Sequence, residues 1–525
     1  FGSRPLARAS QLPGPGPQPS AAASAVSRRA MAAREVQAAE GRQAAAGKGG
    51  AAGYFGELGA FVRLTWPLLL GNTLEWYEFG VYAYVEKQMQ ENFFGGSVMS
   101  TWLGFSVTFV SRPLGGLVLG WIADNLGRRL SVNLSLAGML IATVGQGLLP
   151  SRYLLPSLRH VGLVVLLILR ALQGLSAGGE IGAITSYIVE TGELRTLGMA
   201  ISLISVGSQI SWALASGGIA LLSSALGEEA MLVWGWRVPF IIALIPGVIG
   251  LWGRNNIPET EAFLQECQER AAEAGAEAGA SAKPKAKQWA VAELVSAHLP
   301  ALLVSAGGAV GIATMWYVPP FWTVSTLLEP VLGNTDALWI GNMAQLVGLA
   351  ATPLAGWLTD RYGVGWVTLV GAAFFALTAL PVYVWLHSSP ADRAVAYTCV
   401  GVFYGGAQGF AGATIYLFCA ELFPARLRCI GLALSYNLAV SYIGGFGCTI
   451  SEALFRASPQ VGPGAYFAAC GAVSVLAVLA GLALQRRGVL QLSHRRAQPY
   501  FGRAAPAACP PAAAGKAAAS PAESA

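Results

Sequence analysis

The chain has 525 residues, of which 54% are hydrophobic and 11% are charged, and its formal net charge is +6. Soluble domains carry about 25% charged residues, so this composition excludes a chain built of ordinary water-soluble domains. The lysines and arginines are scattered over segment ends and tails, so we expect no nucleic-acid partner.

The seven cysteines and four histidines show no metal-ligand spacing. No C-x-x-C pair occurs, and no two histidines lie one helical turn apart. The glycine-rich stretches lack the lysine and hydroxyl residue that end a phosphate-binding loop. We therefore expect no metal, no cofactor and no enzymatic activity.

Residues 1–55 are rich in alanine, glycine, proline and arginine, and we predict a disordered cytoplasmic segment. The arginines leave an organelle transit peptide open, although Glu35 and Glu40 dilute that signal. Downstream, apolar windows of about 20 residues recur, each long enough to cross ~30 Å of hydrocarbon. Their predicted starts are residues 61, 98, 131, 160, 198, 235, 297, 336, 366, 394, 429 and 465.

A polar stretch from Arg254 to Lys287 divides these windows into two sets of six. We predict an all-α polytopic membrane protein with twelve transmembrane helices in two six-helix halves, residues 56–254 and 297–486. A cytoplasmic linker occupies residues 255–296, and residues 487–525 form a disordered cytoplasmic tail.

Loop charge predicts the orientation, because lysine and arginine favour the cytoplasmic side. The loops on one side carry most of these residues, among them Arg128, Arg129, Arg254 and Arg361. The C-terminal tail adds Arg486 to Arg496 on the same side. Both termini are expected in the cytoplasm and the protein in the plasma membrane, with an organelle membrane as the alternative.

An internal repeat supports the duplication. Gly120-Trp-Ile-Ala-Asp-Asn-Leu-Gly-Arg128 follows the second span, and Gly356-Trp-Leu-Thr-Asp-Arg-Tyr-Gly363 follows the eighth. Parallel repeats of this kind place a substrate site between the halves near the bilayer midplane.

The first copy of the repeat resembles the G-x-x-x-D-x-x-G-R-R signature of the major facilitator superfamily. More narrowly, the chain is similar to the metabolite:proton symporter family, whose members carry dicarboxylates, 2-oxoglutarate, citrate, shikimate, proline or betaine. The similar segments include GNTLEWYEFGVY (71–82), RALQGLSAGGE (170–180) and AELFPARLR (420–428), and Glu78 stands where that family has Asp. The resemblance implies proton-coupled symport of a small organic acid or zwitterionic osmolyte by alternating access. We expect the protein to act as a monomer in the lipid bilayer.

Placing a charged side chain inside hydrocarbon costs roughly 3 kcal/mol of insertion free energy, so the charged residues found there usually have a function. They concentrate in the first six spans, as Glu75, Glu78, Arg112, Arg170 and Glu180. Counting ~1.5 Å per residue from polar edges places Glu75, Arg112 and Arg170 about 16 to 18 Å deep, near the midplane. Two acids and two bases are therefore expected to share one cavity.

We predict Glu75 or Glu78 as the proton carrier, and Arg112 or Arg170 as the counter-charge to a substrate carboxylate. A guanidinium suits that role because it can bind a carboxylate through two parallel hydrogen bonds. A permanent structural ion pair is the alternative for each residue. Glu180 is expected about 15 Å nearer the cytoplasm than Arg170. It is either a proton site or part of an inner gate in which it pairs with Arg128.

Gating residues are expected in the repeat loops and in the loops after spans four and ten, a role that the resemblance implies. Such surface pairs contribute under ~1 kcal/mol each, so they act only if they form in one transport state. The candidates are Asp124, Arg128, Arg129, Glu190, Arg195, Asp360, Arg361, Glu421, Arg426 and Arg428.

Polar and aromatic residues within otherwise apolar spans complete the predicted substrate site. Binding pockets use few placed polar groups, so we expect only part of this set to contact substrate. The set is Tyr77, Gln173, Trp316, Tyr317, Asn342, Gln345, Gln408, Tyr436 and Asn437.

Two other functions stay open. An uncoupled facilitator or sugar-type porter shares the expected architecture, although Pro258-Glu-Thr-Glu261 stands where sugar porters carry P-E-S-P-R. A transport-dead nutrient sensor is the third interpretation, and measured substrate flux would dismiss it.

Overall fold

The computed structural model describes residues 51–191, 196–254, 290–424 and 427–490, and every regular element in these residues is a helix. Ten of the described helices are long and apolar enough to cross a membrane. The described residues up to Gly59 fall in one unit and those from Ala60 onward in a second, and the following description concerns the second.

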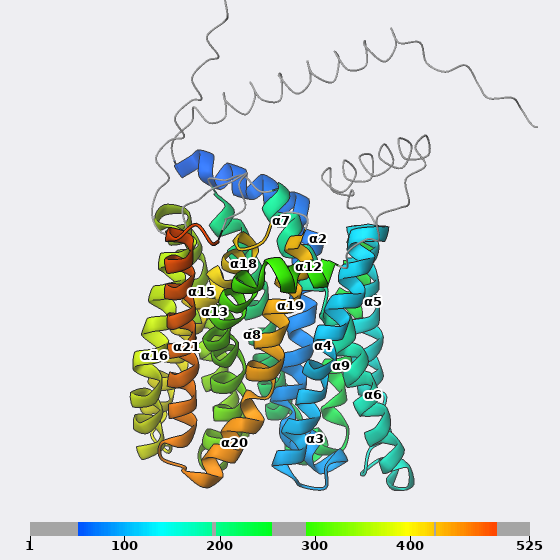
Figure 1. The fold of residues 1–525 in the computed structure, drawn as a ribbon. Coiled ribbons are helices and arrows are strands. Elements are labelled where there is room, and N and C mark those ends of the chain that lie inside the picture. The colour runs from blue at the N-terminus through cyan, green and yellow to red at the C-terminus, as the bar shows by residue number, and fades with distance from the viewer. Residues whose placement is uncertain (1–50, 192–195, 255–289, 425–426, 491–525) are drawn as a thin grey trace, which may run out of the picture. The chain divides into compact units, whose positions relative to one another are not determined.

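The helices of the N-terminal half run side by side (Figure 1). They are α2 (Ala51–Tyr84), α3 (Glu86–Phe93), α4 (Val98–Leu126), α5 (Arg128–Gly147), α6 (Arg159–Ala177), α7 (Glu180–Thr191), α8 (Leu197–Ala230), η3 (Met231–Gly235), α9 (Arg237–Ile242) and α10 (Leu244–Arg254).

The C-terminal half has a corresponding set. It comprises α12 (Ala290–Ala297), α13 (Leu299–Tyr317), η4 (Val318–Leu328), α14 (Glu329–Leu332), α15 (Asn334–Tyr362), α16 (Val364–Ser388), α17 (Arg393–Ala396), η5 (Tyr397–Tyr404), α18 (Gly405–Glu421), α19 (Arg428–Ala439), η7 (Val440–Gly445), α20 (Gly447–Ala457) and α21 (Gly462–Arg486).

The predicted spans agree with these helices. Each predicted start lies within three residues of an observed helix start, except that α2 begins at Ala51 rather than at residue 61. With α2 and the helical run from Arg393 to Glu421, the apolar helices complete the predicted twelve. The fold class is therefore confirmed for the described residues.

The repeated loop motif has one backbone conformation in both halves. Gly127 ends α4 with φ 111° and ψ 145°, and Gly363 ends α15 with φ 94° and ψ 148°. Only glycine adopts this region without strain, because any side chain would clash there. The duplication read from the sequence is thus repeated in the structure.

Helix α13 changes its winding at the centre of the C-terminal half. Pro319 and Pro320 follow Tyr317, and the chain continues as the wider π-helical segment η4. Each proline removes one backbone donor, so the regular hydrogen-bond ladder cannot continue through this pair.

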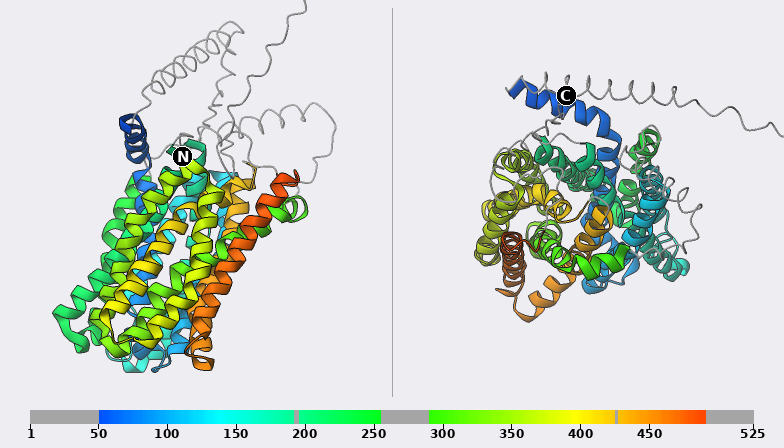
Figure 2. Two further views of the ribbon diagram at one scale, coloured as in Figure 1. Left: turned by 90° about the vertical axis from the view of Figure 1, so that its left-hand side faces the viewer. Right: turned by 45° about the horizontal axis from the view of Figure 1, so that its top comes forward.

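The two halves meet along α8 with α15 and along α4 with α19. Figure 2 shows the N-terminal half, blue to green, beside the C-terminal half, green to red. We call the end with α12 and the end of α10 the linker end, and the end with α3 and α20 the distal end (Figure 1).

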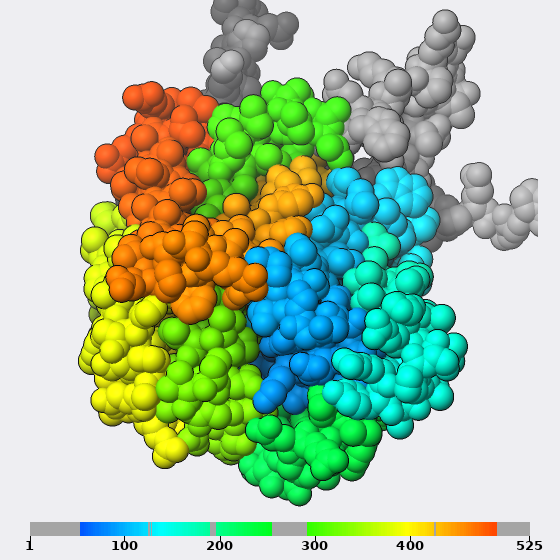
Figure 3. Space-filling view, turned by 90° about the horizontal axis from the view of Figure 1, so that it is seen from below, coloured from blue at the N-terminus to red at the C-terminus, as the bar shows by residue number. Residues whose placement is uncertain are grey.

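The halves contact each other at both ends. At the distal end, Ser106 Oγ donates a hydrogen bond to the Gly445 carbonyl at 2.9 Å, and Figure 3 shows the two halves in contact on this face. At the linker end, the Asp360 carboxylate accepts hydrogen bonds from the backbone N–H groups of Gly198 and Met199. The halves are therefore bonded to each other at both ends of the bundle.

Candidate functional site along helix α2

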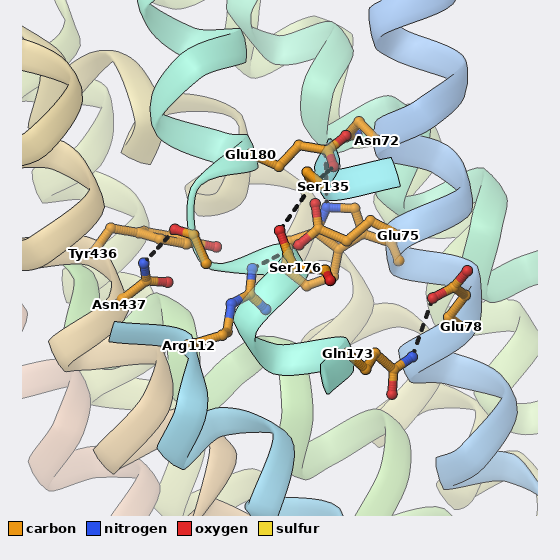
Figure 4. Close-up of polar contacts among 12 residues, drawn as sticks. Asn72, Glu75, Glu78, Arg112, Ser135, Gln173, Ser176, Glu180, Tyr436 and Asn437 are labelled. Atoms are coloured by element: carbon orange, nitrogen blue, oxygen red, sulfur yellow. Dashed lines mark hydrogen bonds and ion pairs between the residues drawn. The ribbon is translucent and has the colours of Figure 1, made fainter. Parts of the chain in front are cut away.

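Three buried acid–base groups lie along α2 in the N-terminal half. Their acids are Glu75, Glu78 and Glu180, and their bases are Arg112, Arg170 and Arg254, each at most 1% exposed. Figure 4 shows Glu75, Glu78 and Glu180 with their neighbours. Six buried charges of balanced sign are costly unless each finds partners, so their contacts define what each can do.

Glu75 and Arg112 form a direct ion pair between α2 and α4. Arg112 Nη2 lies 2.7 Å from Glu75 Oε1. The other Glu75 oxygen and two further donors of Arg112, Nε and Nη1, are buried and have no hydrogen-bond partner among the described residues. Arg112 therefore keeps capacity to bind a second anionic group.

Glu78 reaches Arg170 only through an amide. Gln173 Nε2 donates to Glu78 Oε2 at 3.2 Å, and Arg170 Nη1 donates to Gln173 Oε1 at 2.8 Å. Arg170 also donates to the Phe105 carbonyl at 2.9 Å and stacks 4.1 Å above the Tyr82 ring. The two acids on α2 thus have separate direct partners, and the four charges expected in one cavity divide into a Glu75–Arg112 pair and a Glu78–Gln173–Arg170 chain.

Glu180 pairs with Arg254, a residue that we had assigned to a cytoplasmic loop. Arg254 is fully buried at the end of α10, and its Nη2 contacts Glu180 Oε1. Arg254 Nη1 also donates to the Val132 carbonyl at 2.7 Å, and the Ser135 hydroxyl lies 2.6 Å from the second Glu180 oxygen. The loop assignment of Arg254 is wrong, because its guanidinium finds enough acceptors to be buried.

The glycine at position 71 explains how this third group fits beside α2. A side chain at Gly71 would overlap the Arg254 guanidinium. Arg254 Nε also points to the Pro67 carbonyl at 3.4 Å, on the same helix. Helix α2 therefore accommodates the arginine only because this position has no Cβ.

The predicted polar residues of the C-terminal half lie at the interface between the halves. Asn437 Nδ2 donates to the Gly178 carbonyl at 2.7 Å, and Asn342 Nδ2 donates to the Ala213 carbonyl at 2.7 Å. Gln408 Nε2 lies 3.1 Å from Gln345 Oε1 and 3.4 Å from Gln209 Oε1. Uncharged amides therefore link the C-terminal half to the N-terminal half.

Three buried tyrosines of the C-terminal half, Tyr317, Tyr416 and Tyr436, lie in the surroundings of Arg112. The Tyr416 and Tyr436 hydroxyls are 3.4 Å apart, whereas the buried Tyr317 hydroxyl has no hydrogen-bond partner among the described residues. Polar groups of both halves therefore lie around Arg112.

Trp316 and Tyr77 occupy different places. The Trp316 ring packs 5.2 Å from the Trp76 ring, centroid to centroid, at the interface. Tyr77 instead donates from its hydroxyl to the Pro239 carbonyl at 3.1 Å, within the N-terminal half. The structure therefore brings Trp316 to the centre and leaves Tyr77 outside that group.

The gating candidates divide into described and undescribed residues. The Asp124, Arg128 and Glu190 side chains, and all of Arg195 and Arg426, lie outside what the structure describes. Arg129 and Arg361 are exposed, and Arg361 stacks 5.3 Å from the Trp357 ring. Glu421 and Arg428 are buried, with Arg428 Nε 3.3 Å from the Ala420 carbonyl. Asp360 bonds across the interface, to the backbone of Gly198 and Met199.

Several contacts were missed from the sequence. At the distal end, Lys87 Nζ lies 3.5 Å from Glu329 Oε1 in the other half and 3.6 Å from Glu228 Oε2 in its own half. Trp76 and Trp212 also lie at the centre and were not singled out. The position of Lys87 at the end of a segment does not reveal its partner Glu329 across the interface. For Trp76 a signal was present, because this residue lies between Glu75 and Glu78 in the sequence.

Comparisons with known proteins agree with this architecture. The sequence profile of the Major Facilitator Superfamily matches residues 68–449. The proline/betaine transporter of Salmonella typhimurium is 30% identical over 427 residues, covering 79% of this chain and 82% of the relative. A glycine betaine/proline/ectoine/pipecolic acid transporter of Dickeya dadantii is 29% identical over 423 residues, with 79% and 81% coverage.

A solved structure shows the same fold. The proton:xylose symporter bound to 6-bromo-6-deoxy-D-glucose aligns with a TM-score of 0.62 at 18% identity, covering 82% of this chain and 96% of that one. The matched relatives are transporters and not enzymes, in agreement with the expectation from the sequence. The profile match and the 30% identical relative together show that this integral membrane chain belongs to the major facilitator superfamily.

Proposed function

We propose that this protein is a proton-coupled symporter of a zwitterionic osmolyte, with glycine betaine and proline as the first candidates. The relatives in Salmonella and Dickeya are named as transporters of these compounds. A zwitterion of this kind carries a carboxylate and a positively charged nitrogen, so its site needs a group for each charge.

The observation that carries the proposal is the unused binding capacity of Arg112. Its Nη2 pairs with Glu75, while Nε and Nη1 are buried without acceptors. Nε and Nη1 point to different sides of the guanidinium, so each can donate one hydrogen bond to a carboxylate oxygen, and a two-donor fork that includes Nη2 becomes available when Glu75 leaves. Tyr317, Tyr416 and Tyr436 of the other half lie around the same guanidinium, and their hydroxyls are further polar groups that a substrate carboxylate could bind.

Coupling follows from competition for that guanidinium. A substrate carboxylate that binds Arg112 displaces Glu75, and a buried carboxylate without a counter-ion is costly. Glu75 then takes a proton, and the halves rock to the other side with substrate and proton bound together. On release of both, the Glu75–Arg112 pair forms again. Glu78, which has an amide and no arginine as its direct partner, is the second candidate for the proton.

The orientation and membrane are part of the same proposal. The excess of lysine and arginine on one set of loops supports cytoplasmic termini. The proposal also places the protein in the plasma membrane and takes it to work as a monomer. Reagents that cannot cross the membrane should label a cysteine placed on the linker side only in inside-out vesicles.

Uptake into proteoliposomes tests the function. Labelled glycine betaine and proline should accumulate when the outside is more acidic than the lumen, and a protonophore should abolish this accumulation. Protein-free liposomes and the Arg112→Gln variant serve as controls. Uptake that ignores the proton gradient would instead identify an uncoupled facilitator, and uptake of citrate or 2-oxoglutarate alone would replace the substrate class.

A further inference from the structure

Three buried indole rings meet at the centre of the interface. Trp76 on α2 and Trp212 on α8 come from the N-terminal half, and Trp316 on α13 comes from the C-terminal half. Their ring centroids are 5.4 Å (Trp76–Trp212), 5.2 Å (Trp76–Trp316) and 6.5 Å (Trp212–Trp316) apart. The interplanar angles of these three pairs, in the same order, are 84°, 79° and 84°, so each ring is nearly perpendicular to the other two.

The N-terminal half holds its two rings by itself. Trp76 Nε1 donates to Asn72 Oδ1 at 3.1 Å, and Trp212 Nε1 donates to the Trp76 carbonyl at 2.9 Å. These bonds do not involve the C-terminal half, so they can persist when the halves separate. A separation of the halves that carries Trp316 with the C-terminal half would expose the faces of Trp76 and Trp212 that Trp316 now covers.

A positive group already lies against this aromatic surface. The Arg112 guanidinium carbon is 5.8 Å from the Trp76 ring centroid and 5.1 Å from that of Phe79. The surface is therefore compatible with a cation, because the faces of aromatic rings carry negative electrostatic potential. The free donors of Arg112 lie next to the same rings, so sites for a cation and for a carboxylate are adjacent.

We propose that Trp76, Trp212 and Trp316 bind the positively charged nitrogen of the substrate and select nitrogens that carry alkyl groups. This inference rests on the proposed function, in which Arg112 binds the carboxylate of the same zwitterion. A quaternary or secondary ammonium offers few or no N–H groups, so it gains little from hydrogen-bond acceptors and more from ring faces. The ammonium enters between the rings when the halves separate and is enclosed by Trp316 when they close.

A methylation series on the wild-type protein tests the preference directly. Tryptophan fluorescence of the purified full chain should report dissociation constants for glycine, N-methylglycine, N,N-dimethylglycine and glycine betaine. We expect the constant to fall along the series, by about tenfold or more overall. A constant that stays level or rises with methylation overturns the inference.

An analogue without the positive charge separates the contribution of charge to binding from that of hydrophobic contact. In 3,3-dimethylbutanoate a carbon replaces the nitrogen of glycine betaine, so the shape is kept and the positive charge is lost. Binding by ring faces predicts about tenfold or weaker affinity for this compound than for glycine betaine. Equal affinity would mean that the site recognises shape alone, and the inference would fail.

Variants at Trp316 assign the effect to the ring. Trp316→Phe keeps an aromatic face and should retain the methylation preference, whereas Trp316→Met should reduce it to about threefold or less. The role of this ring is overturned if both variants keep the preference for methylated nitrogens, and also if both lose it. Failure of the proposed function looks different, because wild-type proteoliposomes would then take up neither betaine nor proline. Uptake with no methylation preference leaves the proposed function standing and removes only the aromatic site.

Discussion

The two halves share a fold and a repeated loop motif, yet they bury different kinds of polar group. The N-terminal half holds three acids and three arginines along α2, each at most 1% exposed. In the C-terminal half the central polar residues are amides and hydroxyls, such as Asn342, Gln345 and Gln408. Among its described buried charges, Glu421 ends α18 and Arg428 begins α19, whereas Glu452 lies in the middle of the short helix α20 at the distal end.

This difference in buried polar groups suggests that the two halves have different functions in transport. Buried charge is expensive, so it is expected where a charge must change during the cycle. The N-terminal half then supplies proton and carboxylate chemistry, and the C-terminal half supplies neutral donors and one aromatic wall. Charge changes in the first half should therefore have larger effects than polar changes in the second.

The largest effect is expected for Arg254→Gln. This change leaves Glu180 buried without its counter-ion, and breaking such a pair costs about 3–5 kcal/mol. Thermal unfolding in detergent should show a large loss of stability, and the double variant Glu180→Gln/Arg254→Gln should recover most of it. A double variant no more stable than Arg254→Gln would contradict the pairing. Arg486→Gln, at the exposed end of α21, is the matched control and should unfold like wild type.

Arg112→Gln comes next. It removes the proposed carboxylate partner, and losing one member of a buried charge pair in a binding site costs about 2–5 kcal/mol. The dissociation constant for betaine should rise by about 100-fold, and Arg112→Lys should not restore it, because a lysine lacks the fork of two donors. Binding measured by titration calorimetry checks this, with Arg486→Gln again unchanged. Near-normal affinity in Arg112→Gln would move the carboxylate site elsewhere.

The pair of variants Glu75→Gln and Glu78→Gln should identify the proton carrier. Each amide keeps the shape of the acid but cannot carry a proton, and Gln at position 78 can still bond Gln173. Because Glu75 is the proposed carrier, Glu75→Gln should lower accumulation against a gradient by about tenfold or more while exchange of labelled for unlabelled betaine continues, and Glu78→Gln should leave accumulation near the wild-type level. The reverse result would assign the proton to Glu78.

Neutral contacts of the C-terminal half should matter less. Gln345→Leu removes one amide from the Gln345–Gln408–Gln209 group, and a typical hydrogen bond contributes about 0.5–1.5 kcal/mol. We expect a two- to tenfold change in betaine affinity, and Gln345→Glu as a charged comparison should be worse. A loss as large as that of Arg112→Gln would break the proposed division between the halves.

The smallest effect is expected at the distal end. Lys87→Met removes the pairs with Glu329 and Glu228, and half-exposed ion pairs contribute under ~1 kcal/mol. Stability should change little, and uptake should change by less than about threefold unless the contact forms only in the closed state. Uptake measured at low and high salt checks this, since salt screens an exposed pair and should mimic the substitution.

The sequence by itself determined the helices, the duplication and the family. Hydrocarbon thickness sets the length of each apolar window, so every predicted span after the first starts within three residues of an observed helix. The glycines that end α4 and α15 were visible in the repeat, because their backbone conformation admits no other residue. The charges of α2, α4 and α6 were also apparent, since charge stands out in apolar segments.

Only the tertiary structure decided which of these groups meet. Glu75 and Glu78 sit one turn apart, yet one pairs with Arg112 and the other with Gln173. Arg254 was read as a loop charge and is fully buried, and Trp212 reaches Trp76 and Trp316 from a distant part of the chain. In a membrane the lipid-facing and protein-facing sides of a helix are both apolar, so hydrophobic periodicity does not reveal helix rotation. The partners follow from how helices of both halves are rotated and packed, and that information is not local to any segment.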